Sequence, residues 1–323
     1  MEMMLLPILA LLGLALFVDF GGDDDTSEPA PDDPNPELNR ESFGAGDDTT
    51  TGTDVTDYLF LNDGDDMASG GAGDDSIFLG AGADQTVELG ADGSFDTAGM
   101  EGDDLIRGGE GRDILVDALG SNTIYGDTGY DRINSIDDET SQDTADTVFG
   151  GFGNDVMFVD DGDTVTGGAG DDSVMGGLGA DTIIGGGGFD EFYGGYGNDI
   201  LNTAGPANDA ADTVFGGAGD DTFFADGGDA LVGGTGTDEF NLDLTDPAAN
   251  AVAIDDFDPA TEQLNVDVSI ALDAVPTVTY AVASGGAGTN VLVDGSVAVF
   301  LVGVDPSALS ASNVSVTNTN VTP

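Results

Sequence analysis

The chain has 323 residues and a formal net charge of −60, because 64 aspartates and glutamates face only four arginines and no lysine. This charge excludes nucleic acid as a partner, since phosphate binding needs clustered basic side chains, and it attracts cations. The absence of cysteine and histidine excludes structural zinc, disulfides and Ser-His-Asp or Cys-His catalysis, which leaves carboxylate, hydroxyl and tyrosine chemistry.

Two segments precede any repeat. Met3–Val18 is a nearly unbroken apolar run, close to the lower length limit of a membrane span and without the basic start of a secretory signal. Three interpretations of this apolar segment (residues 1–20) stay open: a membrane anchor, an atypical signal peptide, or a plug that packs on the rest of the chain. Residues 21–42 are acidic and rich in proline, which predicts an extended, disordered linker.

Nine-residue units dominate the middle of the chain. Four of them follow one another without slippage from Gly167 to Asn202 and read GGAGDDSVM, GGLGADTII, GGGGFDEFY and GGYGNDILN. The glycines of the pattern Gly-Gly-x-Gly-x-Asp-x-apolar-x predict a tight turn, because they adopt backbone angles that a Cβ forbids. The last three residues predict a short strand with one inward apolar side chain. One unit cannot pair its strand or bury that side chain alone, so neighbouring units must stack.

Most units before residue 98 are weaker than those that follow, although GGAGDDSIF from Gly70 is complete. Asp57, Asp66 and Asp84 keep the sixth position, but Ala68 and Thr86 stand where a larger apolar side chain belongs. A poorly packed first coil is typical of the terminal repeat of a solenoid, which acts as a cap or frays.

The repeat frame is interrupted at several places. It degrades over residues 79–98, where we expect a loop or an imperfect turn, and insertions occupy residues 135–140 and 203–206. The units around Asp163 and Asp229 are each one residue short, at the same place in two blocks that align with a constant shift. These two blocks indicate a tandem duplication, and the shared deletion indicates a tolerated bulge or bend.

The composition changes after Asn241, where glycine becomes rarer and valine more frequent. Apolar and polar residues alternate in TVTYAVA and in NVLVDGSVAVFLVGV, and Asp294-Gly295 separates two such runs. This pattern predicts antiparallel strands and a two-residue hairpin. We therefore expect a repeat region over residues 43–241 and a small antiparallel β domain over residues 242–323.

The nonapeptide pattern resembles that of the RTX (repeats-in-toxin) family, the hemolysin-type calcium-binding β-roll proteins. The resemblance implies an all-β fold: a parallel β-roll, or right-handed β-solenoid, over residues 43–241, followed by the antiparallel C-terminal domain with a type I secretion signal. It also implies two units per coil, so that alternate units stack on the same edge, and several Ca²⁺ ions between the stacked turns.

In such a roll the metal ligands would be turn carbonyls and the sixth-position aspartates. By resemblance these aspartates are Asp75, Asp104, Asp113, Asp131, Asp146, Asp155, Asp163, Asp172, Asp181, Asp190, Asp199, Asp212, Asp221, Asp229 and Asp238. In one unit Asn122 replaces the aspartate, so we expect a weaker or empty site there. No catalytic residue and no other cofactor is expected.

A stacked row of aspartates needs neutralising charge. Two carboxylates about 4 Å apart repel by about 4 kcal/mol at an effective dielectric of about 20, and the repulsion recurs at every coil. Oxygen-rich, flexible turns suit Ca²⁺ better than Mg²⁺, which demands stricter geometry.

The apolar eighth position is expected to fill a thin core. We assign to it Ile106, Leu115, Ile124, Val148, Met157, Val174, Ile183, Phe192, Ile200, Val214, Phe223 and Phe240. Because one such side chain per nine residues stabilises little, we predict that folding and Ca²⁺ binding are one event. Extracellular modules bind Ca²⁺ at roughly 10⁻⁴–10⁻³ M, so the chain would stay open in the cytosol and fold outside.

These features predict a secreted, extracellular calcium-binding protein with a structural, adhesive or matrix role, and not an enzyme, since no separate segment is long enough for a catalytic domain. Its expected partners are calcium ions, with extracellular polysaccharide or a cell surface as further candidates. Two alternatives stay open. One is a carbohydrate-active β-helix enzyme that modifies polysaccharide, and the other is a surface protein tethered to the membrane by Met3–Val18.

Overall fold

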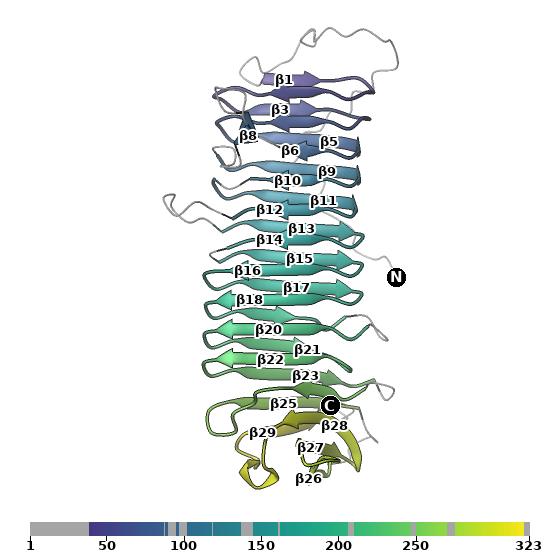
Figure 1. The fold of residues 1–323 in the computed structure, drawn as a ribbon, viewed down its shortest axis with the longest axis vertical. Coiled ribbons are helices and arrows are strands. Elements are labelled where there is room, and N and C mark those ends of the chain that lie inside the picture. The colour runs from purple at the N-terminus through teal and green to yellow at the C-terminus, as the bar shows by residue number, and fades with distance from the viewer. Residues whose placement is uncertain are drawn as a thin grey trace, which may run out of the picture.

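The computed structural model describes residues 39–319, apart from 87, 90–94, 97–101, 118, 137–144, 161, 206–209, 247–249 and 270–274. In this part the chain winds into an elongated stack of coils, from β1 (Asn39–Ser42) at one end to β26–β29 at the other (Figure 1). The expected apolar segment Met3–Val18 and residues 21–38 of the expected linker lie outside the described residues. The prediction of disorder was wrong for the last four linker residues, because Asn39–Ser42 form β1 and pair in parallel with β3. Within them, no helix has the length and apolar character that crossing a membrane requires.

Two long sheets form the two faces of the roll. The first contains, in spatial order, β1, β3 (Asp57–Phe60), β5 (Ser76–Gly82), β9 (Leu105–Gly111), β11 (Thr123–Gly129), β13 (Thr147–Phe152), β15 (Thr164–Ala169), β17 (Thr182–Gly187), β19 (Ile200–Asn202), β21 (Thr222–Ala225), β23 (Glu239–Leu244), β25 (Gln263–Val268) and β29 (Val314–Asn318). The second contains β2 (Thr49–Thr51), β4 (Met67–Ser69), β6 (Gln85–Thr86), β10 (Ile114–Val116), β12 (Arg132–Asn134), β14 (Val156–Phe158), β16 (Ser173–Gly177), β18 (Glu191–Tyr196), β20 (Thr213–Ala218), β22 (Ala230–Thr235), β24 (Val252–Ile254), β28 (Ser296–Val302), β27 (Gly288–Val293) and β26 (Val278–Val282).

Successive nonapeptides therefore alternate between the two sheets, and two of them make one coil. β15 pairs in parallel with β17, with Val165 opposite Ile183, while β16 pairs with β18 in the second sheet. The prediction that alternate units stack on the same edge is confirmed, as is the all-β parallel roll.

The core is a column of side chains between the two sheets. Side chains alternate in direction along a strand, so the eighth residue of each unit points inward and its two neighbours point out. Val174, Ile183 and Phe192 are fully buried in this way. One predicted core residue was wrong: Ile200 is 43% exposed, and Leu201 beside it is the buried residue at 1%. Leu201 is the eighth residue of GGYGNDILN, and only the phase of the repeat distinguishes the two.

The interruptions of the repeat leave the stack continuous. Where the frame degrades, β7 (Glu88–Leu89) and β8 (Phe95–Asp96) form a small antiparallel pair in place of the expected loop. The two insertions lie partly outside the described residues. On either side of them β12 still pairs with β14, and β19 with β21, in parallel.

The C-terminal strands close one end of the roll (Figure 1). β28 pairs in parallel with β24 and in antiparallel fashion with β27, which in turn pairs with β26. The predicted hairpin is confirmed, because Asp294 and Gly295 connect β27 to β28 with φ of 51° and 85°, as a type I′ turn requires. Both long sheets continue beyond Asn241, and the domain boundary at that residue stays a prediction.

Candidate calcium-binding rows of aspartates

The sixth-position aspartates stand where each turn ends and the next strand begins. Because alternate units stack, they form two rows, one along each edge of the roll. All fifteen predicted metal ligands are buried, with at most 3% of the residue surface exposed. The first Asp row follows the strands of the first sheet and contains Asp48, Asp66, Asp84, Asp113, Asp131, Asp155, Asp172, Asp190, Asp212 and Asp229. The second Asp row contains Asp57, Asp75, Asp104, Asn122, Asp146, Asp163, Asp181, Asp199, Asp221 and Asp238.

One hydrogen bond links each member of a row to the next. The backbone N–H of Asp172 donates to Oδ1 of Asp190 at 2.9 Å, and the N–H of Asp190 donates to Oδ1 of Asp212 at 2.8 Å. The same bond joins every neighbouring pair in both rows, with N···O distances between 2.6 and 3.0 Å. At Asn122 the amide oxygen accepts the corresponding bond from the backbone N–H of Asp104. The hydrogen-bonded row therefore continues through this residue, although it carries no negative charge.

The second carboxylate oxygen has a different environment in most of these residues. It is buried and has no hydrogen-bond partner in Asp75, Asp113, Asp131, Asp155, Asp172, Asp181, Asp199, Asp221 and Asp238. Leaving a buried charged oxygen without a partner is costly, because the water it loses on folding is not replaced. A repeated defect of this kind indicates a ligand that supplies positive charge.

Asp57, a further buried row member missing from the predicted ligand set, differs, because its Oδ2 accepts the backbone N–H and the hydroxyl of Thr53 and only its Oδ1 has no partner. Asp66 and Asp84 were also missing from that set, and they do share this environment: both are buried, and Oδ2 of each has no hydrogen-bond partner. Their sixth position in the frame was the available signal. It was outweighed by the weak apolar residues of their units, Ala68 and Thr86, although both of these are buried as well.

Burial makes several members of the rows hard to ionise. Desolvation, together with the charges of neighbouring aspartates, raises the pKa of Asp172 and of Asp181 to about 8. The same cause raises the pKa of Asp131 and of Asp221 to about 7, while the bond from the preceding backbone N–H opposes the shift. A row that carries its full negative charge near neutral pH therefore needs a compensating cation.

The two shortened units differ from the others. In Asp163 the second oxygen accepts the backbone N–H of Asp160 at 2.9 Å. In Asp229 it accepts the backbone N–H of Asp226 at 3.1 Å and the hydroxyl of Thr203 at 2.9 Å. Because one residue is missing, the turn closes around its own aspartate, and backbone N–H groups occupy the oxygen that has no partner in residues such as Asp172 and Asp221.

The first glycine of each turn makes room for that oxygen. A Cβ at Gly150 would lie 2.7 Å from Oδ2 of Asp155 and 2.6 Å from the carbonyl oxygen of Gly167 in the next coil. At Gly176 the corresponding distances, to Asp181 and Gly194, are 2.6 and 2.5 Å. Glycine is required at these two positions by space alone, since neither has a positive φ. Each step of a row thus brings a carboxylate oxygen and a carbonyl oxygen to the same place.

This donor set fits a hard cation that accepts mixed oxygen ligands. In the part of the chain that the structure describes, no three acidic side chains converge on one point. The oxygens available at each step are therefore one or two carboxylates and the backbone carbonyls of two turns. Ca²⁺ accepts such flexible combinations, whereas Mg²⁺ requires near-ideal octahedral geometry.

The fold and the two Asp rows define a calcium-binding β-roll. The family model described as RTX calcium-binding nonapeptide repeat (four copies) matches residues 51–85, 98–133, 142–163, 160–183, 175–205 and 207–240. These matches cover more than half of the chain, and the chain belongs to this family. Its repeats bind Ca²⁺, its Asp-rich positions fit several ions, and proteins that carry such repeats are typically secreted. A search of curated proteins finds no match.

Proposed function

We propose that this chain is a secreted protein that folds when it binds several calcium ions outside the cell, and that it has a structural, adhesive or matrix role there rather than a catalytic one. One observation supports this above all: two rows of buried carboxylates that include many members, such as Asp131, Asp172 and Asp221, with one oxygen that has no partner. Burying so many unpaired charges opposes folding until cations neutralise them.

The ions would be held by the sixth-position aspartates and by turn carbonyls. The strongest candidates are aspartates whose second oxygen no protein group occupies, such as Asp172 and Asp221, and the set extends to Asp66 and Asp84. Asp163 and Asp229 would contribute less, because backbone N–H groups already occupy their second oxygens. Bound Ca²⁺ supplies the positive charge that lets adjacent coils approach.

The test of this proposal is far-UV circular dichroism of the full chain during a Ca²⁺ titration, with Mg²⁺ as the control. We expect a cooperative transition from coil to sheet near millimolar Ca²⁺, the affinity range of extracellular modules, and little change with Mg²⁺. A complete sheet signal in excess chelator at neutral pH would refute folding on binding.

Localisation needs a separate experiment. Fractionation of a culture that expresses the full chain should place most of it in the medium. Recovery in the membrane fraction would instead favour the tethered alternative, with Met3–Val18 as anchor.

A further inference from the structure

The arginines of this protein differ in whether an acidic side chain pairs with them. Arg107 is paired with Asp127, to whose two carboxylate oxygens its Nε and Nη2 donate at 3.0 and 2.6 Å. Two of the other three arginines, Arg112 and Arg132, lie on neighbouring coils, in the turn after β9 and at the start of β12. Among the residues that the structure describes, neither forms a salt bridge. Two guanidinium groups without a salt bridge on neighbouring coils are unexpected in a chain of net charge −60.

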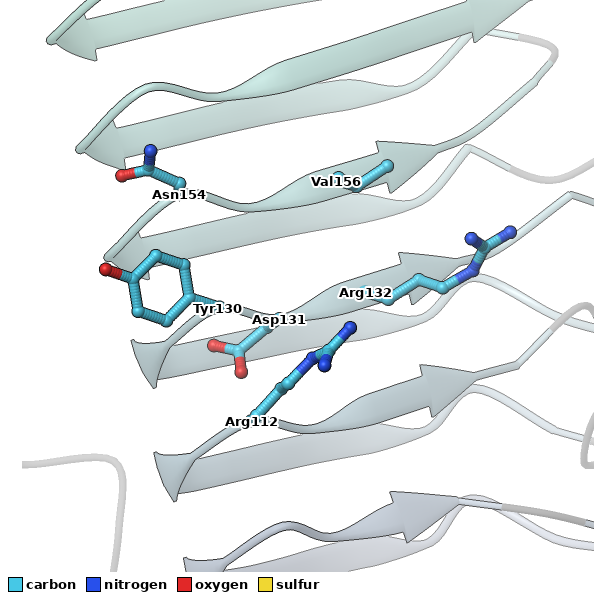
Figure 2. Close-up of a pocket in the computed structure, with 6 residues that line it drawn as sticks. All are labelled: Arg112, Tyr130, Asp131, Arg132, Asn154 and Val156. Atoms are coloured by element: carbon cyan, nitrogen blue, oxygen red, sulfur yellow. The ribbon is translucent and has the colours of Figure 1, made fainter.

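Both arginines line one surface pocket of about 420 Å³ (Figure 2), which lies within the size range of small-ligand sites. Arg112, Tyr130 and Asn154 occupy the same turn position in three successive coils. Arg132 and Val156 begin the strands that follow two of these turns, and the row residue Asp131 lies beneath them. The pocket therefore spans three coils and exists only when these coils are stacked.

The pocket presents two kinds of surface. The Arg132 guanidinium lies over the ring of Phe158, 4.9 Å from its centroid, which holds the group along the sheet. Figure 2 shows Arg112 and Arg132 reaching along the sheet from neighbouring coils, while the Tyr130 ring stands at the turn. Tyr130 is 64% exposed and offers an aromatic face to solvent.

The acid in the pocket does not compensate these arginines. Oδ1 of Asp131 accepts the backbone N–H of Asp113, and its Oδ2 is buried against Gly126 and the carbonyl of Gly150, in the row. Asp131 is therefore turned toward the interior of the roll and not toward the arginines at the surface.

We infer that the Arg112–Tyr130–Arg132 pocket binds the carboxylate of an acidic sugar. A guanidinium group presents parallel N–H donors that match the two oxygens of a carboxylate, and a second one nearby reinforces this preference. The apolar C–H face of a sugar ring packs on an aromatic ring, as an exposed tyrosine offers. The inference rests on the proposed function and deepens it, because it names the class of polymer that a matrix protein would hold.

Charge sets the conditions for binding. The excess of acidic groups repels any anion at long range until Ca²⁺ neutralises the rows. Binding should therefore require the calcium-loaded roll, and it should weaken as sodium chloride screens the arginine–carboxylate attraction.

The experiment is calorimetric titration of the full chain, at saturating Ca²⁺, with a galacturonic acid trisaccharide. Circular dichroism of the same samples establishes that the roll is formed. We expect binding to fall at least tenfold in the double variant R112Q/R132Q and to be retained in R40Q, which removes the same kind of charge outside the pocket. Tyr130→Ala should reduce affinity for the trisaccharide without changing that for acetate.

Further titrations separate the possible ligands. A neutral galactose trisaccharide should bind at least tenfold more weakly than the acidic one, and equal binding would overturn the inference. Preference for a sulfated neutral sugar, or equal affinity for acetate and the acidic trisaccharide, would also overturn it. So would unchanged binding in the double variant, which would point to sugar held through Ca²⁺ alone. A folded chain that binds nothing overturns this inference only, whereas a chain that Ca²⁺ fails to fold overturns the proposed function together with it.

Discussion

At the scale of the residue, the second carboxylate oxygen distinguishes one buried aspartate from another. Asp221 and Asp229 are both row members with about 1% exposure or less, and each accepts a backbone N–H at Oδ1. Oδ2 of Asp221 has no partner, whereas Oδ2 of Asp229 accepts from Asp226 and Thr203. The two residues therefore form a matched pair in which only the oxygen available to a cation differs.

We predict that Asp221→Asn reduces the number of bound Ca²⁺ ions. The amide oxygen can preserve the row, as Asn122 does, but the variant lacks the negative charge that a cation requires. The measurement is the slope of unfolding free energy against the logarithm of Ca²⁺ concentration, which reports the ions taken up on folding. The slope should decrease in Asp221→Asn and stay close to the parent value in Asp229→Asn. Equal slopes in both variants would contradict the distinction.

Glycine at the start of a turn is predicted to be indispensable for steric reasons. In Gly176→Ala, the new Cβ would lie 2.5 Å from the carbonyl oxygen of Gly194 and 2.6 Å from Asp181, so either the backbone or the row must shift. We expect a loss of about 1–3 kcal/mol, the usual cost of overpacking, together with weaker Ca²⁺ binding. The control is Gly44→Ala, where nothing lies within 4 Å of the added carbon and the Ca²⁺ titration should be unchanged. Parent-like behaviour of Gly176→Ala would refute the requirement for space.

At the scale of the element, each short strand depends on its single inward side chain. Phe189 and Phe192 belong to the same nonapeptide, yet Phe189 is 63% exposed in the turn and Phe192 is fully buried in β18. Phe192 stands between Val174 and Val214 of the neighbouring strands. Substitutions at these two residues can thus separate the contribution of a core side chain to stability from that of a turn side chain in the same nonapeptide.

We predict that Phe192→Ala destabilises the calcium-loaded roll by about 3–5 kcal/mol, the cost of a large cavity in a core. Phe189→Ala should change stability by less than about 0.5 kcal/mol, as exposed substitutions usually do. Chemical denaturation at saturating Ca²⁺ measures both. If the two substitutions had equal effects, the inward position would not be the source of strand stability.

Much of this element-level arrangement could be predicted from the sequence, because a nine-residue period fixes which side chains share a face. The phase of the repeat identified fifteen buried aspartates and eleven of the twelve core residues assigned from it, and the exception, Ile200, came from choosing between two adjacent apolar residues. The partner of each second oxygen could not be predicted. It depends on how a shortened turn closes around Asp163 or Asp229, which is a matter of tertiary geometry.

At the scale of the whole molecule, the two Asp rows act as one electrostatic unit. Hydrogen bonds of the same kind run from Asp48 to Asp229 and from Asp57 to Asp238, across both insertions. Apart from the neutral Asn122, charge at one step is therefore repeated at the next along both edges. Protons and Ca²⁺ are alternative ways to neutralise the same groups, so pH and calcium should control the same transition.

The metal-free chain should respond to pH. Burial raises the folded-state pKa of Asp172 and Asp181 to about 8 and that of Asp75, Asp131 and Asp221 to about 7, from a usual value of 3.8. Between about pH 4 and pH 8 the folded state therefore binds protons that the unfolded state has released. Linkage then requires that the free energy of unfolding decreases as pH rises through this window.

In excess chelator, the sheet signal in circular dichroism should consequently appear as the pH is lowered from 8 to 5 and disappear when it is raised again. At pH 7.5, Ca²⁺ should produce the same signal and release protons, which calorimetry in buffers of different ionisation enthalpy detects. High sodium chloride at pH 8 is the control, because it screens exposed charges but does not protonate buried ones. If salt alone restored the sheet, general repulsion and not ionisation of the buried rows would be what keeps the metal-free chain unfolded.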